Sequence, residues 1–212
     1  MHNDTNLPSD GDDQTPSRDQ QPPASGLTNT VSDGLPSLAL GLAIADAVHE
    51  AITTYTQDDG VGHCVLYAYV GAMVASRVMR RLYLPFAGSL RLTVAHDGAG
   101  WLLDARHGGL DRQEFHAWCG RVHADNRIEL VDLAARHYKA LLERSRALDG
   151  QPKPTWARED PPRYLWGFLA ALPPWVQFIP LEETMRELTR AMEPGTAEIQ
   201  IIAAAAQHRL MH

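Results

Sequence analysis

The segment GHCVLYAYVGAMVASRVMRR, residues 62–81, decides the fold of this chain. It predicts a helix from about His63 to Arg81 with apolar residues on most of its faces. A helix that is apolar nearly all round is buried among other elements. Cys64 stands at the start of this helix, after a loop at 57–62 whose two glycines allow tight turns. We therefore expect a central buried helix with a thiol at its N-terminus.

The residues before this segment divide into a helix and a tail. A helix is predicted from Pro36 to about Thr56, since apolar side chains recur there at helical spacing. Residues 1–34 are rich in Asp, Ser, Pro, Gln and Thr and nearly lack large apolar side chains. Such a composition does not offset the entropy of ordering, which predicts a disordered acidic tail. We expect a single domain over residues 35–212.

After the central helix, apolar residues alternate with a period of two, which is typical of strands. SLRLTVA (89–95) and WLLDAR (101–106) form one predicted hairpin, and EFHAWCGRV (114–122) and RIELVDL (127–133) form a second. Helical patterns return at 134–148 and near 164–171, 181–193 and 196–210. Helices, then antiparallel strands, then further helices predict an α+β fold, with a small antiparallel sheet, the Cys64 helix packed on it and additional C-terminal helices.

Composition excludes several functional classes. The formal charge of −7 argues against a nucleic-acid partner, which needs a basic face. The first 35 residues hold six aspartates and one arginine, so the remainder is close to neutral. No apolar stretch is long enough to span a membrane, and the first thirty residues lack a signal-peptide core. Two cysteines do not form a disulfide framework. We expect a cytoplasmic protein that does not bind membranes.

Three residues stand where a cysteine nucleophile, its base and an orienting carboxylate would be needed. If the second hairpin turns around Ala124, His116 and Asp132 face each other directly, with Cβ atoms ~4.5–5.5 Å apart. An imidazole and a carboxylate at that distance can hydrogen-bond. At the helix start, the dipole favours the thiolate of Cys64. The free N–H groups of Cys64 and Val65 are candidates for an oxyanion hole.

Each of these residues also has a structural interpretation. A lone cysteine is usually a small buried hydrophobe, and a strand histidine is usually a satisfied polar group. Asp132 is placed to cap the helix predicted from Ala134. Strand alternation directs Cys119 to the opposite face from His116, which weakens a zinc site. The other histidines considered are expected at the surface by default: His63, His96, His107, His123 and His137.

The sequence resembles the transglutaminase-like branch of the papain-like cysteine hydrolases. The resemblance covers residues 60–135 and rests on Cys64 with Ala68, on His116-Ala117-Trp118 and on Asp132. It implies that Cys64 is the nucleophile, His116 the base and Asp132 the residue that orients it. The chain departs from the family at the residues beside Cys64, where His63 and Val65 stand in place of an aromatic residue.

Two further residues are weaker candidates. The resemblance suggests Gln57 as an oxyanion-hole glutamine, because papain-like enzymes often place one a little upstream of the cysteine; a surface loop position is the alternative. Trp118 shares a face with His116 by strand alternation, so it either walls a substrate slot or packs in the core.

These residues predict a cysteine-dependent hydrolase or acyl-transferase acting on an amide, ester or thioester in a peptide, a protein or a small acyl substrate. The triad needs no cofactor and no metal. The alternative is a catalytically inactive member of the same fold that binds a protein or peptide. Acetyl transfer from an acyl-CoA ranks lower, because no glycine loop for phosphates is evident.

Overall fold

The computed structural model of the protein describes residues 34–95, 98–107, 114–144 and 154–212, and all structural statements below concern these residues. The predicted tail lies outside them except for Gly34, as do parts of the loops at 105–113 and 150–163. Residues 35–212 form one unit.

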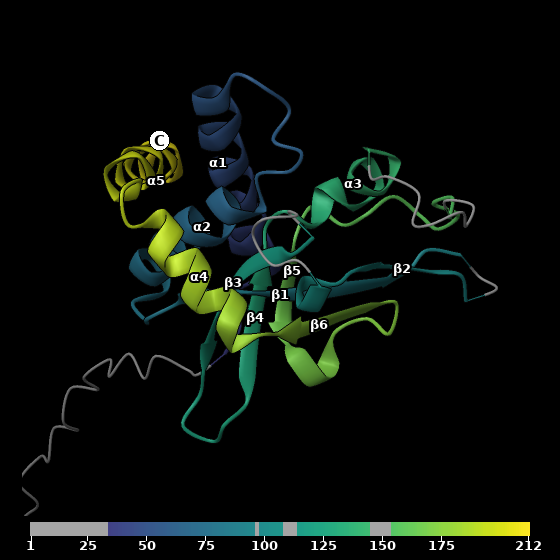
Figure 1. The fold of residues 1–212 in the computed structure, drawn as a ribbon. Helices are drawn as coiled ribbons and strands as arrows, with labels where there is room; N and C mark the ends of the chain where they lie inside the picture. Colours follow the sequence, from purple (N-terminus) through teal and green to yellow (C-terminus); the bar gives the residue numbers. More distant parts are fainter. Residues whose placement is uncertain (1–33, 96–97, 108–113, 145–153) are drawn as a thin grey trace, which may run out of the picture. The chain divides into compact units, whose positions relative to one another are not determined.

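The described chain contains five α-helices, six strands and three short 3₁₀ helices (Figure 1). The α-helices are α1 (Leu38–Thr56), α2 (Cys64–Met79), α3 (Tyr138–Arg144), α4 (Glu182–Met192) and α5 (Thr196–Met211). The strands are β1 (Leu84–Thr93), β2 (Gly100–Leu103), β3 (His116–Val122), β4 (Ile128–Asp132), β5 (Leu165–Phe168) and β6 (Val176–Pro180). The 3₁₀ helices are η1 (Ala105–His107), η2 (Ala135–His137) and η3 (Leu169–Ala171).

The strands form one antiparallel sheet in the order β2-β1-β3-β4-β5, with β6 paired to β1. The long strand β1 pairs with β3 through its first half and with β2 and β6 through its second half. This sheet with its helices confirms the predicted α+β class.

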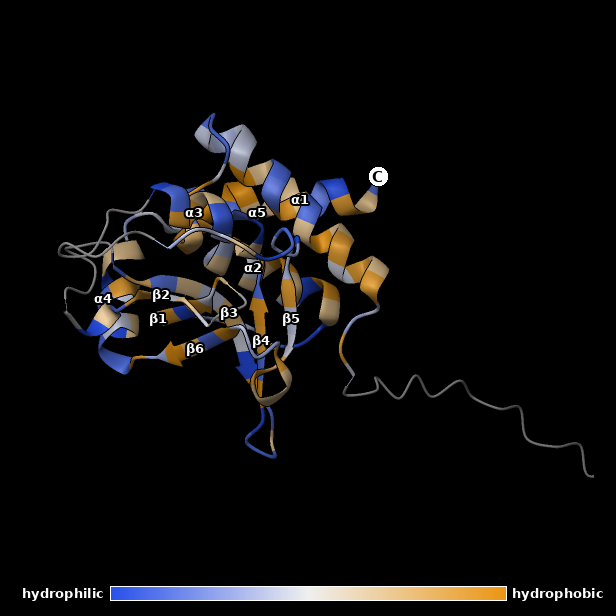
Figure 2. Ribbon diagram, turned by 90° about the vertical axis from the view of Figure 1, so that its right-hand side faces the viewer, coloured by the Kyte–Doolittle hydropathy of each residue, from blue (hydrophilic) through white to orange (hydrophobic). Residues whose placement is uncertain are grey.

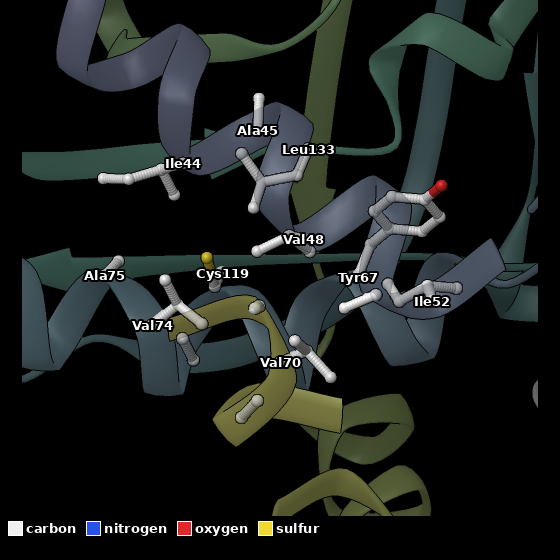
Figure 3. Packing of buried hydrophobic residues seen from close by; sticks show 14 of the residues in the cluster. Ile44, Ala45, Val48, Ile52, Tyr67, Val70, Val74, Ala75, Cys119 and Leu133 are labelled. Atoms are coloured by element: carbon white, nitrogen blue, oxygen red, sulfur yellow. The ribbon is translucent and has the colours of Figure 1, made fainter. Parts of the chain in front are cut away.

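Helix α2 is the centre of the helical layer, as its composition predicts. It packs on β3 and lies against α1 and α5, which also contact each other (Figure 1). Ile44 and Val48 of α1 meet Val70 and Val74 of α2 in one buried cluster, where Cys119 of β3 also lies (Figure 3). Burial of an Ile or Val side chain contributes ~1.5–3 kcal/mol to the free energy of folding, and this burial holds α2 on the sheet.

The other face of the sheet has its own, more aromatic core. Trp118 of β3 and Leu130 of β4 pack there with Tyr138, Phe178 and other buried side chains. Neighbouring positions on the same strands, such as Cys119, belong to the α2 side, as alternation along a strand requires. Hydrophobic residues dominate β4, whose two faces both contact a core (Figure 2). His116 shares its face with Trp118 and hence belongs to the aromatic side.

Some predicted elements differ from the observed ones. Residues 164–171, predicted as a helix, form β5 and η3, and β6 was not predicted. Both strands pair with distant partners, β4 and β1, and this pairing overrides the local helical pattern. Residues 84–88, which precede the strand predicted at 89–95, are the half of β1 that pairs with β3. The helix predicted at 134–148 begins as η2 and becomes α-helical only at Tyr138. No helix of the described residues could span a bilayer.

Gly88 allows β6 to approach β1, and we predict that Gly88→Ala destabilises the fold. A Cβ on Gly88 would lie 2.1 Å from the backbone oxygen of Ile179, so β6 would have to move. We expect a loss of about 1–3 kcal/mol in the free energy of unfolding, measured by urea denaturation. Gly167→Ala is the control, because its Cβ would meet only a side-chain atom at 3.5 Å. Equal losses in the two variants would contradict the prediction.

Candidate active site

Cys64 is the first residue of α2, and its side chain is partly exposed. The N-cap residue, His63, makes no capping bond with its side chain. The first amide of this helix that finds a backbone acceptor is that of Tyr67, which donates to the His63 carbonyl at 3.1 Å. The N–H groups of Cys64 and Val65 therefore remain free of backbone acceptors in the described structure, as the helix start requires.

The loop before Cys64 is held by local polar contacts. Gly60 has a φ of 79°, a conformation that favours glycine, and its N–H donates to Asp58 at 2.8 Å. Asp58 also pairs with the imidazole of His63 at 2.7 Å. The hydrogen bond from His63 is the main cause that lowers the pKa of Asp58 to about 2. Asp59 pairs with Arg144 of α3. These contacts fix the turn that presents the thiol.

Gln57 caps the C-terminus of α1 in the described structure. Its φ is 58°, in the left-handed region, and its N–H donates to the Thr53 carbonyl at 3.0 Å. Its side-chain amide turns back to the Thr54 carbonyl of the same helix. The residue is exposed. This position matches the surface alternative for Gln57, and none of its described hydrogen bonds points it at Cys64.

The register of the β3–β4 hairpin differs from the predicted one by two residues. Cys119 pairs with Val131, whereas the prediction paired His116 directly with Asp132. The cause is a three-residue turn between His123 and Arg127, in which Asn126 adopts a φ of 62°. A shift of two keeps every side chain on its face. Asp132 is therefore a diagonal rather than a direct neighbour of His116, and diagonal pairs still lie within reach of long side chains.

His116 and Asp132 form a buried pair on this shared face. The Nε2 atom of His116 lies 2.7 Å from Oδ2 of Asp132, and each side chain is 1 % exposed. Because a carboxylate only accepts hydrogen bonds, Nε2 carries a hydrogen and donates it. Because Nε2 is bonded to Asp132, Nδ1 is the ring nitrogen that remains available for proton exchange.

Two opposing effects act on the proton affinity of His116. Burial is the largest and lowers its pKa, but the charge and hydrogen bond of Asp132, with smaller contributions from Cys64, raise the pKa to about 10. The raised folded-state pKa means that this proton stabilises the fold fully below the unfolded value near 6.5. The contribution is then lost as the pH rises from there toward 10. The Asp132 carboxylate therefore favours the protonated form of His116.

The Nδ1 atom of His116 is buried and has no partner that satisfies hydrogen-bond geometry in the described structure. Buried polar atoms without partners are rare, and they occur at catalytic sites among other places. The side chain of Cys64 nevertheless lies close enough to raise the pKa of His116 through its charge and as a weak hydrogen-bond partner. The structure thus brings Cys64, His116 and Asp132 together from α2, β3 and β4.

Asp132 combines the two roles that the sequence left open. Its Oδ1 accepts the N–H of Ala134 at 2.9 Å, which closes the turn into η2. Its Oδ2 accepts from His116 and also from the hydroxyl of Tyr138. Asp132 therefore caps the following segment and orients the imidazole at once.

The two cysteines have different surroundings. Cys119 is fully buried between the sheet and α2, and burial raises the pKa of its thiol (Figure 3). Trp118 is also buried; its ring stacks on His116 and meets Phe178 edge to face. This corresponds to the core-packing alternative, in which Trp118 packs against the ring of His116. Val65 follows Cys64 on α2 and packs against a smaller buried cluster that includes Ala68 and Ala117.

Sequence reasoning missed the polar residues that brace the site. Tyr138 bonds Asp132 and is fully buried. The hydroxyl of Tyr67, one turn after Cys64, contacts Nδ1 of His49 at 2.6 Å and Nε2 of His137 at 2.9 Å. Burial lowers the pKa of His137 to about 4, so this imidazole is neutral at neutral pH. The signal for Tyr138 was its place one turn beyond the strand that carries Asp132.

The expectation that His123 lies at the surface was wrong. His123 is buried and bonds the fully buried Glu129 at 2.8 Å. The other oxygen of Glu129 accepts from Tyr83 and Trp166, both at 2.7 Å. The turn between β3 and β4 returns this imidazole to the sheet. Within the described ranges, no group of three or more His, Cys, Asp or Glu side chains is placed to hold a metal ion.

Comparisons with known proteins leave the chain without an assigned family. No protein-family model matches it, and no curated protein matches it. One solved structure, described only as the crystal structure of a genomics target, aligns with a TM-score of 0.47 and 13% identity over 79% of this chain and 77% of that one. A resemblance this weak supports no inference about function.

We predict that Asp132→Asn leaves His116 neutral at pH 7. The substitution removes the negative charge that raises the pKa of His116, while burial, which lowers it, remains. NMR of the labelled imidazole should show wild-type His116 protonated at neutral pH and the variant deprotonated. Glu129→Gln is the matched control, since it removes the other buried carboxylate of this hairpin. A His116 that stays protonated in Asp132→Asn would contradict the prediction.

Proposed function

We propose that the protein is a cysteine-dependent hydrolase or acyl-transferase in which Cys64, His116 and Asp132 act as nucleophile, base and orienting carboxylate. The observation that carries the proposal is the state of His116. One ring nitrogen is fixed on a buried carboxylate, and the other is buried without a partner beside the Cys64 side chain. A histidine that serves structure alone would have both nitrogens satisfied.

The reaction follows from these positions. The thiol proton of Cys64 passes to Nδ1 of His116, and the sulfur attacks the carbonyl carbon of an amide, ester or thioester. The carbonyl electron pair moves onto oxygen, which the free N–H groups of Cys64 and Val65 are placed to stabilise. Collapse expels the leaving group, which takes the proton from His116. Water or an amine then attacks the thioester, returns a proton to His116 and releases Cys64.

The surroundings of His116 support these proton transfers. The Asp132 carboxylate stabilises the imidazolium that forms when the thiol ionises. The positive end of α2 acts on the sulfur in the same sense. No cofactor enters this sequence of steps.

The resemblance to transglutaminase-like and papain-like cysteine hydrolases remains part of this proposal. It is supported by the order of the three residues and by a helix that begins at the cysteine and packs on an antiparallel sheet. A peptide, a protein or a small acyl compound is the proposed substrate, and a cytoplasmic location, which suits a reduced thiol, is proposed with it. The alternative, a binding module of the same fold, predicts that Cys64 forms no thioester.

Selective alkylation tests the activated thiol. We predict that iodoacetamide modifies Cys64 in the native protein at neutral pH, whereas Cys119, which is 0 % exposed, reacts only after unfolding. His116→Gln should slow the modification of Cys64 on the order of tenfold, because it removes the imidazolium. Peptide mass spectrometry measures both rates. If Cys64 reacted equally fast in the wild type and in His116→Gln, the proposed activation of the thiol by His116 would be wrong.

Acyl-enzyme trapping tests catalysis itself. We predict that activated esters and thioesters acylate Cys64, seen as a mass increase on its peptide, and that Cys64→Ala abolishes this product. Asp132→Asn should slow acylation by about 10²–10⁴-fold. Cys119→Ala is the matched control and should be acylated at the wild-type rate, since Cys119 is fully buried and lies on the opposite face of β3 from His116. A thiol that alkylates readily but never forms a thioester would favour the binding module.

A further inference from the structure

Tyr138 is the one hydroxyl that meets the Asp132 carboxylate in the described structure. It comes from α3, the helix that follows the capped turn after β4. Its hydroxyl donates a short hydrogen bond to Oδ2 of Asp132, the same oxygen that accepts from His116. Its ring also meets the His116 ring edge to face, with the centroids 5.8 Å apart. Tyr138 therefore touches both partners of the buried pair.

We propose that Tyr138 is a positioning residue that weakens the hold of Asp132 on the His116 proton, so that the imidazole can exchange that proton with Cys64. The inference rests on the proposed function in treating His116 as the base. Two donors share one carboxylate oxygen, and each hydrogen bond to that oxygen stabilises part of its negative charge. The charge left to attract the imidazolium is correspondingly smaller.

The surroundings give this hydroxyl a fixed role as donor. Tyr138 is fully buried, and both burial and the nearby carboxylate raise its pKa, so the phenol keeps its hydrogen. The groups that act on His116 are Asp132 of β4, Cys64 of α2 and Tyr138 of α3. Of these three, Tyr138 alone donates to the carboxylate oxygen that also accepts from His116. The Trp175 ring, 6.3 Å from that of Tyr138, packs on its far side.

The β3–β4 hairpin also contains a second buried carboxylate and imidazole pair, which is not part of the candidate site and supplies a control. Glu129 and His123 form a buried carboxylate and imidazole pair, and Tyr83 donates to Glu129 at 2.7 Å. Glu129 lies on the opposite face of β4 from Asp132. Tyr83→Phe and Tyr138→Phe thus remove the same kind of bond from two different carboxylates.

The test is the titration of His116, followed by NMR in protein with labelled histidine and assigned by comparison with His116→Gln. We expect Tyr138→Phe to raise the titration midpoint by about one pH unit, because Asp132 then holds the proton more strongly. Tyr83→Phe should leave the midpoint at its wild-type value. A midpoint that does not move in Tyr138→Phe, or that moves equally in both variants, overturns the proposal.

A second variant decides the matter if Tyr138→Phe does not fold. Replacement of Tyr138 by 3-fluorotyrosine keeps the ring and hydroxyl but makes the phenol a stronger donor. It should lower the His116 midpoint, and an unchanged or higher midpoint overturns the proposal. The titration needs no substrate, so it is separate from the proposed function. A shifted midpoint in a protein that never forms a thioester would reject the enzyme and keep the positioning role.

Discussion

The buried hydrogen bond between His116 and Asp132 is the interaction on which the candidate site depends. Both side chains are 1 % exposed, and the bond gives each of these buried polar groups a partner. The pair lies where β3 and β4 meet the start of η2, so the sheet, the capped turn and α3 all contribute to it. It also determines which nitrogen of His116 faces the thiol.

The hairpin that carries this pair presents two carboxylate and imidazole pairs on opposite faces. Glu129 is bonded by His123, Tyr83 and Trp166, and these contacts hold β4 to neighbouring elements. In the described structure, Nδ1 of His116 is instead buried without a partner of good hydrogen-bond geometry, and Cys64 lies beside it. Under the proposed function, the first pair stabilises the fold and the second takes part in the reaction. The contrast also explains why residue type alone was insufficient to predict that His123 is buried.

Local patterns in the sequence were enough to predict the elements that hold the triad. The apolar composition of residues 62–81 predicts α2, and alternation along 114–122 places His116 and Cys119 on different faces. The rest depends on distant partners. Strands β5 and β6 form only because β4 and β1 accept them. The register of the hairpin follows from one residue, Asn126, in the left-handed region. The bond from Tyr138 requires the turn after Asp132, whose geometry no periodicity encodes.

The neighbours His137 and Tyr138 join α2 to the carboxylate of Asp132. His137 binds Tyr67, three residues after Cys64, and Tyr138 binds Asp132. A displacement of α2 along its axis would therefore pull the same short segment that holds Asp132. Thiol, imidazole and carboxylate are in this sense mechanically coupled and would shift as one body. Under the proposed function, a motion that admits a substrate would then come from an element beside Cys64 that is not part of this body, such as α4, whose Leu188 belongs to the cluster against which Cys64 packs.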